Sequence, residues 1–246
     1  MGFLYNSERG IVKSLIVGFG EIGKAVREVI VDYDKVDTYD KKDDDLYFDT
    51  NTDILHICFP YSEKFIDEVQ WYIDGVKPWH VIIWSTVPIG TTRNFKGAVH
   101  SPVNGVHPNL TRSIKSSVRW IGANDEIEGV FFEQYFKNVF LSTRLVGSSD
   151  FTELLKLQST AMYGINLVFT DYISDITKEL DMDFELVKKF NRDYNKLYHN
   201  LGMDWAQQYI LNPPNGHIGG HCIRENSKLL DEQFPHEMLK QIGEME

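Results

Sequence analysis

The sequence predicts an α/β fold, in which a mostly parallel sheet domain over residues 1–147 is joined by a long helix to a smaller all-helical domain over residues 148–246. Two observations predict this arrangement. In the first part, short apolar runs typical of strands alternate with amphipathic stretches typical of helices, which is the pattern of βαβ units. In the second part the strand pattern stops, and apolar residues recur at helical spacing.

Composition limits the classes of function. The 246 residues are 42% apolar, which is enough for a core in one large or two unequal domains. The net charge of −11 argues against nucleic acid or an anionic membrane as a partner. No stretch reaches the roughly 18 apolar residues of a membrane span, and the N-terminus lacks the order of a secretory signal. The two cysteines lie far apart and predict no disulfide framework, so we expect a cytoplasmic protein.

The first part contains seven predicted strands, each a short run of mainly apolar or β-branched residues. They are Ser14–Val17, Val36–Tyr39, Ile54–Phe59, His80–Trp84, Ala98–Ser101, Arg119–Gly122 and Ser142–Val146. The run Ile54–Phe59 is almost wholly apolar, as expected of a strand covered on both faces, and Cys58 within it is expected to be a core residue. Helices are expected between the strands over Glu21–Val31, Ser62–Tyr72 and Glu126–Phe136.

A helix of about 30 residues is expected after Gly147. The run Ser148-Ser149-Asp150 followed by Glu153 is typical of a helix start, and only Gly164 interrupts the helical pattern before Leu180. Its apolar stripe is broad, so the helix needs partners on more than one side. We expect it to form part of a homodimer interface. A second helix, Phe184–Asn200, and a short helical tail complete the chain.

Three glycines follow the first predicted strand at the spacing G-x-G-x-x-G. In a dinucleotide-binding turn, Gly18 permits the tight bend, Gly20 lets a pyrophosphate approach the backbone and Gly23 lets the helix pack on the strand. Such a motif alone can also be a purely structural turn. Here Asp40 lies 22 residues beyond Gly18, at the end of the second strand, where an acid would bind the ribose hydroxyls. The sequence therefore predicts a Rossmann-type domain.

NAD is the expected cofactor of this domain. Lys41 and Lys42 would suit the 2′-phosphate of NADP, but Asp40 would repel that phosphate. The residues expected to bind the cofactor are Gly18, Phe19, Gly20, Glu21, Ile22, Gly23, Asp40, Pro60, Ser85 and Thr86.

A second glycine-rich stretch, Gly216–Ile223, surrounds Cys222 and precedes a helical pattern. A thiol just before a helix can be kept partly as thiolate by the helix dipole, which makes Cys222 a candidate nucleophile. Two other interpretations remain open: the loop is only a tight turn around a buried cysteine, or His217, His221 and Cys222 bind a metal ion. Since no fourth ligand is evident, we expect no metal.

Four stretches together resemble the UDP-glucose/GDP-mannose dehydrogenase family, the nucleotide-sugar 6-dehydrogenases. They are the glycine turn with Asp40, the S-T-V-P-I-G-T stretch within Trp84–Thr92, the E-L-L-K stretch within Glu153–Leu157, and the G-G-H-C-I stretch within Gly216–Ile223. The resemblance covers the family's dinucleotide domain and its central helical domain. It implies a dimer formed through the central helices.

The resemblance also implies catalytic roles. Cys222 would attack an aldehyde intermediate, a second NAD would oxidise the adduct to a thioester, and water would hydrolyse that thioester. Lys156 would stabilise the developing oxyanion, although by itself it reads as an exposed helix lysine. Thr86 would lie near the nicotinamide and the catalytic water.

The sequence departs from the family pattern at several of these positions. Thr160 replaces an asparagine and Asn226 replaces an aspartate, and an amide cannot act as a base. Val103 replaces an acid, which leaves His107 as the candidate general base of that stretch. The chain ends 24 residues after Cys222, so the family's third domain, which closes over the nucleotide, is not matched.

These departures lead to two hypotheses. The first is an NAD-dependent oxidoreductase that oxidises a compact substrate, a sugar-like molecule or a small alcohol, with Cys222 as possible covalent nucleophile. The alternative is an NAD-binding protein that lacks the family's reaction and acts as a sensor or assembly partner.

Overall fold

The computed structural model describes residues 11–41, 51–105, 108–139, 141–218 and 221–245. It contains two compact units that meet between Lys156 and Leu157, inside the long helix α5 (Ser149–Glu179). The domain boundary expected from the sequence lies just before α5. The first two turns of α5 belong to the sheet unit because their side chains bond to its loops.

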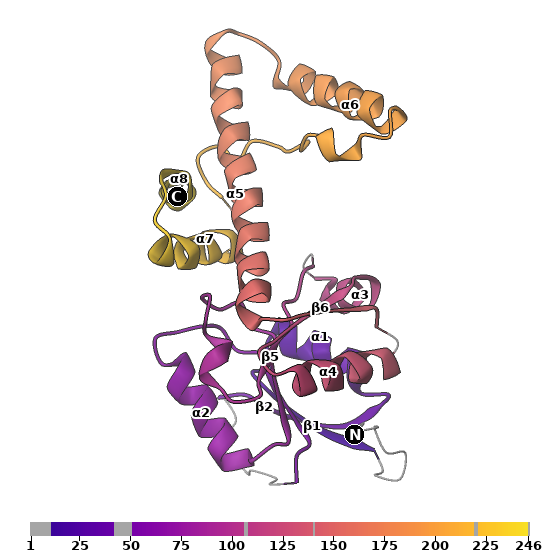
Figure 1. Cartoon of the computed structure of the whole chain (residues 1–246). Helices are drawn as coiled ribbons and strands as arrows, with labels where there is room; N and C mark the ends of the chain where they lie inside the picture. Colours follow the sequence, from indigo (N-terminus) through magenta and orange to yellow (C-terminus); the bar gives the residue numbers. More distant parts are fainter. Residues whose placement is uncertain (1–10, 42–50, 106–107, 140, 219–220, 246) are drawn as a thin grey trace. The chain divides into compact units, whose positions relative to one another are not determined.

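The first unit is built on a seven-stranded sheet with the order β2-β1-β3-β4-β5-β6-β7 (Figure 1). Its strands are β1 Val12–Val17, β2 Asp34–Tyr39, β3 Ile54–Ile57, β4 His80–Ile83, β5 Val99–His100, β6 Arg119–Ala123 and β7 Thr143–Val146. Neighbouring strands are parallel except β5 and β6. All seven strands overlap the predicted ones, and the α/β fold class is confirmed.

Helices cover both faces of this sheet. They are α1 Glu21–Ile30, α2 Phe65–Val76, the short 3-10 helix η1 Thr92–Asn94, α3 Leu110–Ser116 and α4 Glu126–Asn138. One core joins α1, α3 and α4 to the sheet, and the other joins α2 to the opposite face (Figure 1). The strand β3 is buried along its length, as its apolar sequence predicts. The short helix α3 was not predicted.

The second unit consists of the rest of α5 together with α6 Phe184–Asn200, the 3-10 helix η2 Asp204–Ala206, α7 His221–Gln233 and α8 Glu237–Glu244. Gly164 in α5 faces Ile223 of α7 and Ile242 of α8. A Cβ at this glycine would lie 3.0 Å from Ile223 Cγ2 and 2.9 Å from Ile242 Cδ1. Gly164 therefore lets α7 and α8 pack closely against α5, which explains a glycine inside a helix.

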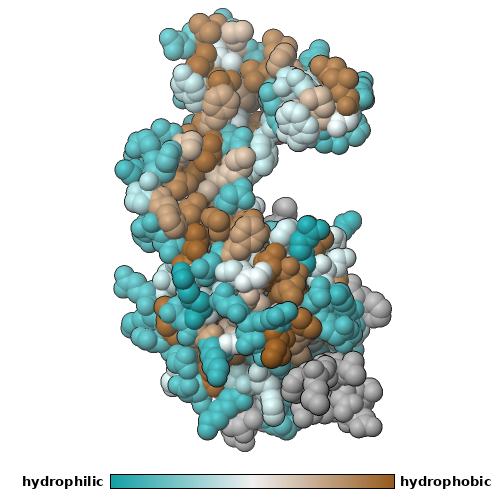
Figure 2. All heavy atoms as spheres, viewed as in Figure 1, coloured by the Kyte–Doolittle hydropathy of each residue, from teal (hydrophilic) through white to brown (hydrophobic). Residues whose placement is uncertain are grey.

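Large apolar side chains remain exposed in the second unit (Figure 2). On α5, Phe169 and Tyr172 are each 61% exposed, and α6 has no buried residue. Contiguous exposed apolar surface of this kind is typical of an interface. No helix in the described part of the chain is long and apolar enough to cross a membrane.

Candidate functional site: a dinucleotide turn and the loops beside it

The turn between β1 and α1 has the geometry that its glycines predict. Gly18 adopts a φ of +90°, and a Cβ at this position would lie 2.6 Å from the backbone nitrogen of Phe59. Gly23 is buried, and a Cβ there would collide with the carbonyl oxygen of Gly18. Both positions therefore require glycine, the first for its conformation and the second for close packing of helix on strand.

Gly20 is different, because a Cβ at this position would meet nothing within 4 Å. It is the N-cap residue of α1, and no side chain caps the helix there. The space beside Gly20 is therefore open at the positive end of the helix dipole, and open space at this end of a helix is typical of a pyrophosphate site. Glu21 and Ile22 form the first residues of that helix.

Asp40 lies beside this turn, as predicted. It follows the last residue of β2, and its Oδ2 accepts a hydrogen bond of 2.9 Å from the backbone N–H of Phe19. A second bond of 2.9 Å runs from Gly18 N to Tyr39 O, so the end of β2 holds the glycine turn directly. Lys41 forms a 2.6 Å ion pair with Glu68, and Lys42 lies outside the described residues.

The loops after β3 and β4 lie next to each other at the same edge of the sheet. The hydroxyl of Ser85 donates a 2.6 Å hydrogen bond to Phe59 O, which immediately precedes the exposed Pro60. Thr86, the next residue, is half-buried. Because β1, β3 and β4 are parallel, their carboxyl ends bring Gly18, Pro60 and Ser85 to one edge, where open α/β sheets bind ligands.

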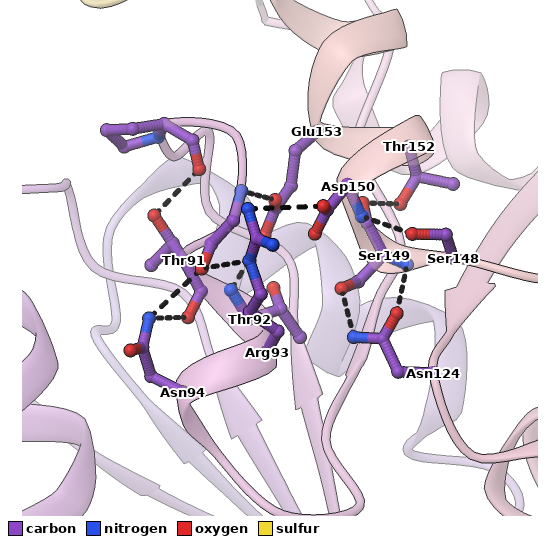
Figure 3. Close-up of polar contacts among 12 residues, drawn as sticks. Thr91, Thr92, Arg93, Asn94, Asn124, Ser148, Ser149, Asp150, Thr152 and Glu153 are labelled. Atoms are coloured by element: carbon purple, nitrogen blue, oxygen red, sulfur yellow. Dashed lines mark hydrogen bonds and ion pairs between the residues drawn. The ribbon is translucent and has the colours of Figure 1, made fainter. Parts of the chain in front are cut away.

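The first two turns of α5 fasten to the loop after β4 (Figure 3). The carboxylate of Glu153 accepts hydrogen bonds from Gly90 N at 2.5 Å and Thr92 N at 2.8 Å. Arg93 forms a 3.3 Å ion pair with Asp150 at the surface. Burial raises the pKa of Glu153, and the bonds from Thr92 and Gly90 oppose that rise. Sequence reasoning identified the E-L-L-K stretch but not this contact.

Lys156 lies one turn further along α5, and its Nζ donates a 2.7 Å hydrogen bond to Val103 O in the loop after β5.

The buried His100 ends β5; its Nε2 lies 3.1 Å from Ser85 O and its Nδ1 lies 2.8 Å from the Thr152 hydroxyl. A carbonyl can only accept, so Nε2 carries the proton. Burial lowers the pKa of His100 to about 4, which keeps the ring neutral. The predicted base His107 lies outside the described residues.

In the second unit, the predicted position of Cys222 in a loop before a helix is wrong. The helix α7 begins at His221, so Cys222 belongs to its first turn, and its side chain is exposed. The alternative in which Cys222 is buried is therefore also wrong. Cys58 is buried, as predicted, and burial raises the pKa of its thiol.

Thr160 and Asn226 contact each other within the second unit. The Asn226 amide donates a 3.2 Å hydrogen bond to the Thr160 hydroxyl, and Asn226 is buried. Two of the positions that depart from the family pattern thus form one neutral pair. The segment before α7 is held by Asp171, whose carboxylate accepts bonds of 2.8 and 3.0 Å from Asn215 N and Gly216 N.

No group of three or more His, Cys, Asp or Glu residues that could hold a metal ion occurs among the described residues. The side chain of His221 lies outside them, whereas His217 is exposed. Residues on both sides of Cys222 line a cavity of about 470 Å³, to which His217 and Arg224 contribute. Cys222 itself is not part of its lining.

The fold of this chain was compared with those of known proteins. No family model and no curated protein matches the sequence. Among solved structures, UDP-D-ManNAc dehydrogenase from Pyrococcus horikoshii matches 95% of this chain and 68% of its own, with a TM-score of 0.77 and 14% identity. UDP-glucose dehydrogenase from Pyrobaculum islandicum matches 96% and 68%, with a TM-score of 0.69 and 16% identity.

The chain has the fold of the UDP-sugar and GDP-mannose dehydrogenases. It spans about two thirds of the length of those proteins. A 3-hydroxyisobutyrate dehydrogenase from Mycobacterium tuberculosis has the same fold over more of its own length, matching 95% of this chain and 91% of its own with a TM-score of 0.69 and 8% identity. At these identities the likeness establishes fold alone.

Proposed function

We propose that this chain is a nicotinamide-dinucleotide-dependent oxidoreductase that prefers NAD and oxidises the hydroxyl of a compact substrate, sugar-like or a small alcohol. The observation that carries the proposal is the turn at Gly18–Gly23, which leaves the N-terminus of α1 open beside Asp40. The shared fold with several dehydrogenases supports it.

The residues present fit the cofactor. Gly20 and the following N–H groups of α1 would hold the pyrophosphate, and Asp40 would accept hydrogen bonds from ribose hydroxyls. Pro60, Ser85 and Thr86 would contact the nicotinamide half at the ends of β3 and β4. When bound, the oxidised nicotinamide supplies a hydride acceptor.

Lys156 is the proposed electrostatic residue of the reaction. Oxidation of an alcohol removes a hydride from carbon and a proton from oxygen, and negative charge develops on that oxygen. An ammonium group held near the ends of the strands, as Lys156 is by Val103 O, would stabilise that charge. The neutral ring of His100 adds no competing positive charge nearby.

Cys222 is the proposed nucleophile toward a carbonyl product, and its exposure on the first turn of α7 suits that role. The Thr160–Asn226 pair offers no carboxylate to take a proton from water. Without such a base, water would not hydrolyse a Cys222 thioester, so repeated turnover would require release of the product before a thioester forms. We therefore propose that the aldehyde or ketone formed by the first hydride transfer is released, and that addition of the Cys222 thiol to its carbonyl is reversible. One reduced nicotinamide would form per substrate molecule, rather than two.

The test is NAD reduction by the purified protein over a panel of nucleotide sugars, free sugars and small hydroxy acids. Lys156→Met should abolish turnover, whereas Lys178→Met, which alters an exposed lysine of the same helix, should not. Cys222→Ala should leave a single hydride transfer intact. Tight cofactor binding without reduction of NAD by any compound would instead support a non-catalytic binding protein.

We further propose that the protein is a cytoplasmic homodimer that associates through the helical unit. The exposed apolar residues of α5 and α6 support this proposal, since a monomer would leave them in water. The second copy is the proposed partner, beside a small-molecule substrate; the net charge of −11 disfavours nucleic acid and anionic membrane.

A further inference from the structure

Glu153 is a fully buried carboxylate that none of the roles above uses. Burying a carboxylate is unfavourable unless hydrogen bonds compensate, and here both oxygens accept backbone N–H groups, Oε2 from Gly90 and Oε1 from Thr92 (Figure 3). The donors lie 63 and 61 residues away in sequence, so the contact holds two distant segments together.

The segment that Glu153 holds is the loop after β4, which contains Ser85 and Thr86. This loop turns at Gly90, whose φ of +92° favours glycine. A Cβ at Gly90 would meet only the flexible end of the Arg93 side chain, so the positive φ, and not a lack of space, favours glycine at this turn. The Glu153 carboxylate binds the backbone on both sides of Thr91 and thereby fixes the bend of the loop.

Glu153 also determines where Lys156 lies. The two residues are three apart on α5 and therefore share one face of the helix. On that face, Glu153 fastens the helix to the loop after β4 and Lys156 reaches Val103 O after β5. A shift of α5 relative to the loop would change the position of the Lys156 ammonium relative to Thr86.

We propose that Glu153 is a positioning residue, which sets the loop carrying Ser85 and Thr86 against the helix carrying Lys156 so that both address the nicotinamide end of the cofactor. The inference rests on the proposed function. It assigns Glu153 no contact with substrate or cofactor. Its negative charge matters, because two N–H donors face it and an amide would present its own N–H to one of them.

The test compares Glu153→Gln and Glu153→Asp with the matched control Arg93→Ala. The control removes the surface ion pair with Asp150, which joins the same loop to the same helix. Fluorescence titration of NADH gives the Kd, steady-state kinetics give KM and kcat, and circular dichroism reports folding.

Glu153→Gln should raise the Kd for NADH about tenfold, because part of the binding free energy would then be used to order the loop that Glu153 holds, and it should also lower kcat. Glu153→Asp should show a smaller rise because it keeps the charge, and Arg93→Ala should match the wild type. If Glu153→Gln does not fold, the Kd of Glu153→Asp decides, and a wild-type value there overturns the inference. A folded Glu153→Gln with unchanged Kd and kcat also overturns it. If the wild type binds no NADH, the proposed function itself fails.

Discussion

Replacing Gly20 with alanine separates the cofactor-binding role of the glycine turn from its structural role. Gly20 has a φ of −77°, which alanine adopts without strain, and the added Cβ would meet nothing within 4 Å. Alanine is a poorer N-cap than glycine by roughly 0.5–1 kcal/mol. Alanine also restricts the unfolded chain more than glycine does, which stabilises the folded state by about 0.4–1 kcal/mol. The free energy of unfolding should therefore change by less than about 1 kcal/mol.

Binding of the dinucleotide should respond very differently. The methyl group that this substitution adds would project into the open space at the N-terminus of α1, where the pyrophosphate is proposed to lie. Losing one N–H bond to a charged phosphate costs about 1.5–3 kcal/mol, which raises Kd roughly ten- to a hundredfold. Titration of NADH fluorescence measures Kd, and urea unfolding measures stability.

Gly18→Ala is the matched comparison. With a φ of +90° and a Cβ that would lie 2.6 Å from Phe59 N, this variant should lose stability as well as binding. A Gly20→Ala protein that binds NADH as tightly as the wild type would refute the placement of the pyrophosphate on this turn. Equal loss of stability in both variants would refute the assignment of separate roles.

Other properties of the chain give three more expected outcomes. A thiol reagent should label Cys222 and not Cys58 in the native protein, because Cys58 is buried and burial raises the pKa of its thiol. Mass spectrometry locates the label, and rapid labelling of Cys58 would contradict its position in the core. His100 is neutral when folded, with a pKa of about 4 against 6.5 as its ordinary value, so the unfolded state binds its proton first as pH falls. Protonation of this histidine in the unfolded state should lower the free energy of unfolding by about 3 kcal/mol between pH 6.5 and 4. Urea unfolding measures this free energy, and a His100→Gln variant with the same pH dependence as the wild type would disprove that His100 is its source. Sedimentation should show a homodimer that Phe169→Glu shifts toward monomer, whereas a monomeric wild type at all concentrations would exclude this interface.

The strands were predictable because a strand that is buried on both faces of the sheet consists of consecutive apolar residues. Ile54–Ile57 is wholly buried and wholly apolar except for His56. The start of β2 was missed because it contains a buried Asp34, which is held by hydrogen bonds from Ser14 Oγ at 2.6 Å and the Tyr135 hydroxyl at 2.7 Å. Those partners lie far away in sequence. The helix α3 was missed because only Leu110 and Ile114 in it are buried, too few for a helical period.

The candidate site also contains residues that could be predicted from the sequence and residues that could not. Gly18, Gly23 and Asp40 were predictable because one local turn and one following strand determine their positions. Glu153 was not assigned its contact because its partners come from a loop more than 60 residues earlier. Cys222 was predicted to lie in a loop because the glycines before it favour a loop, whereas α7 begins directly after them at His221.

The central claim is that a nicotinamide dinucleotide lies along the edge formed by Gly20, Asp40 and the loop after β4. A crystal structure of the protein with NAD tests it most directly. We predict that the pyrophosphate contacts the first N–H groups of α1, that Asp40 binds the adenosine ribose, and that Thr86 or the Lys156 ammonium lies within about 4 Å of the nicotinamide ring or of a substrate oxygen beside it. A dinucleotide bound elsewhere, or one with its pyrophosphate away from α1, would contradict the claim.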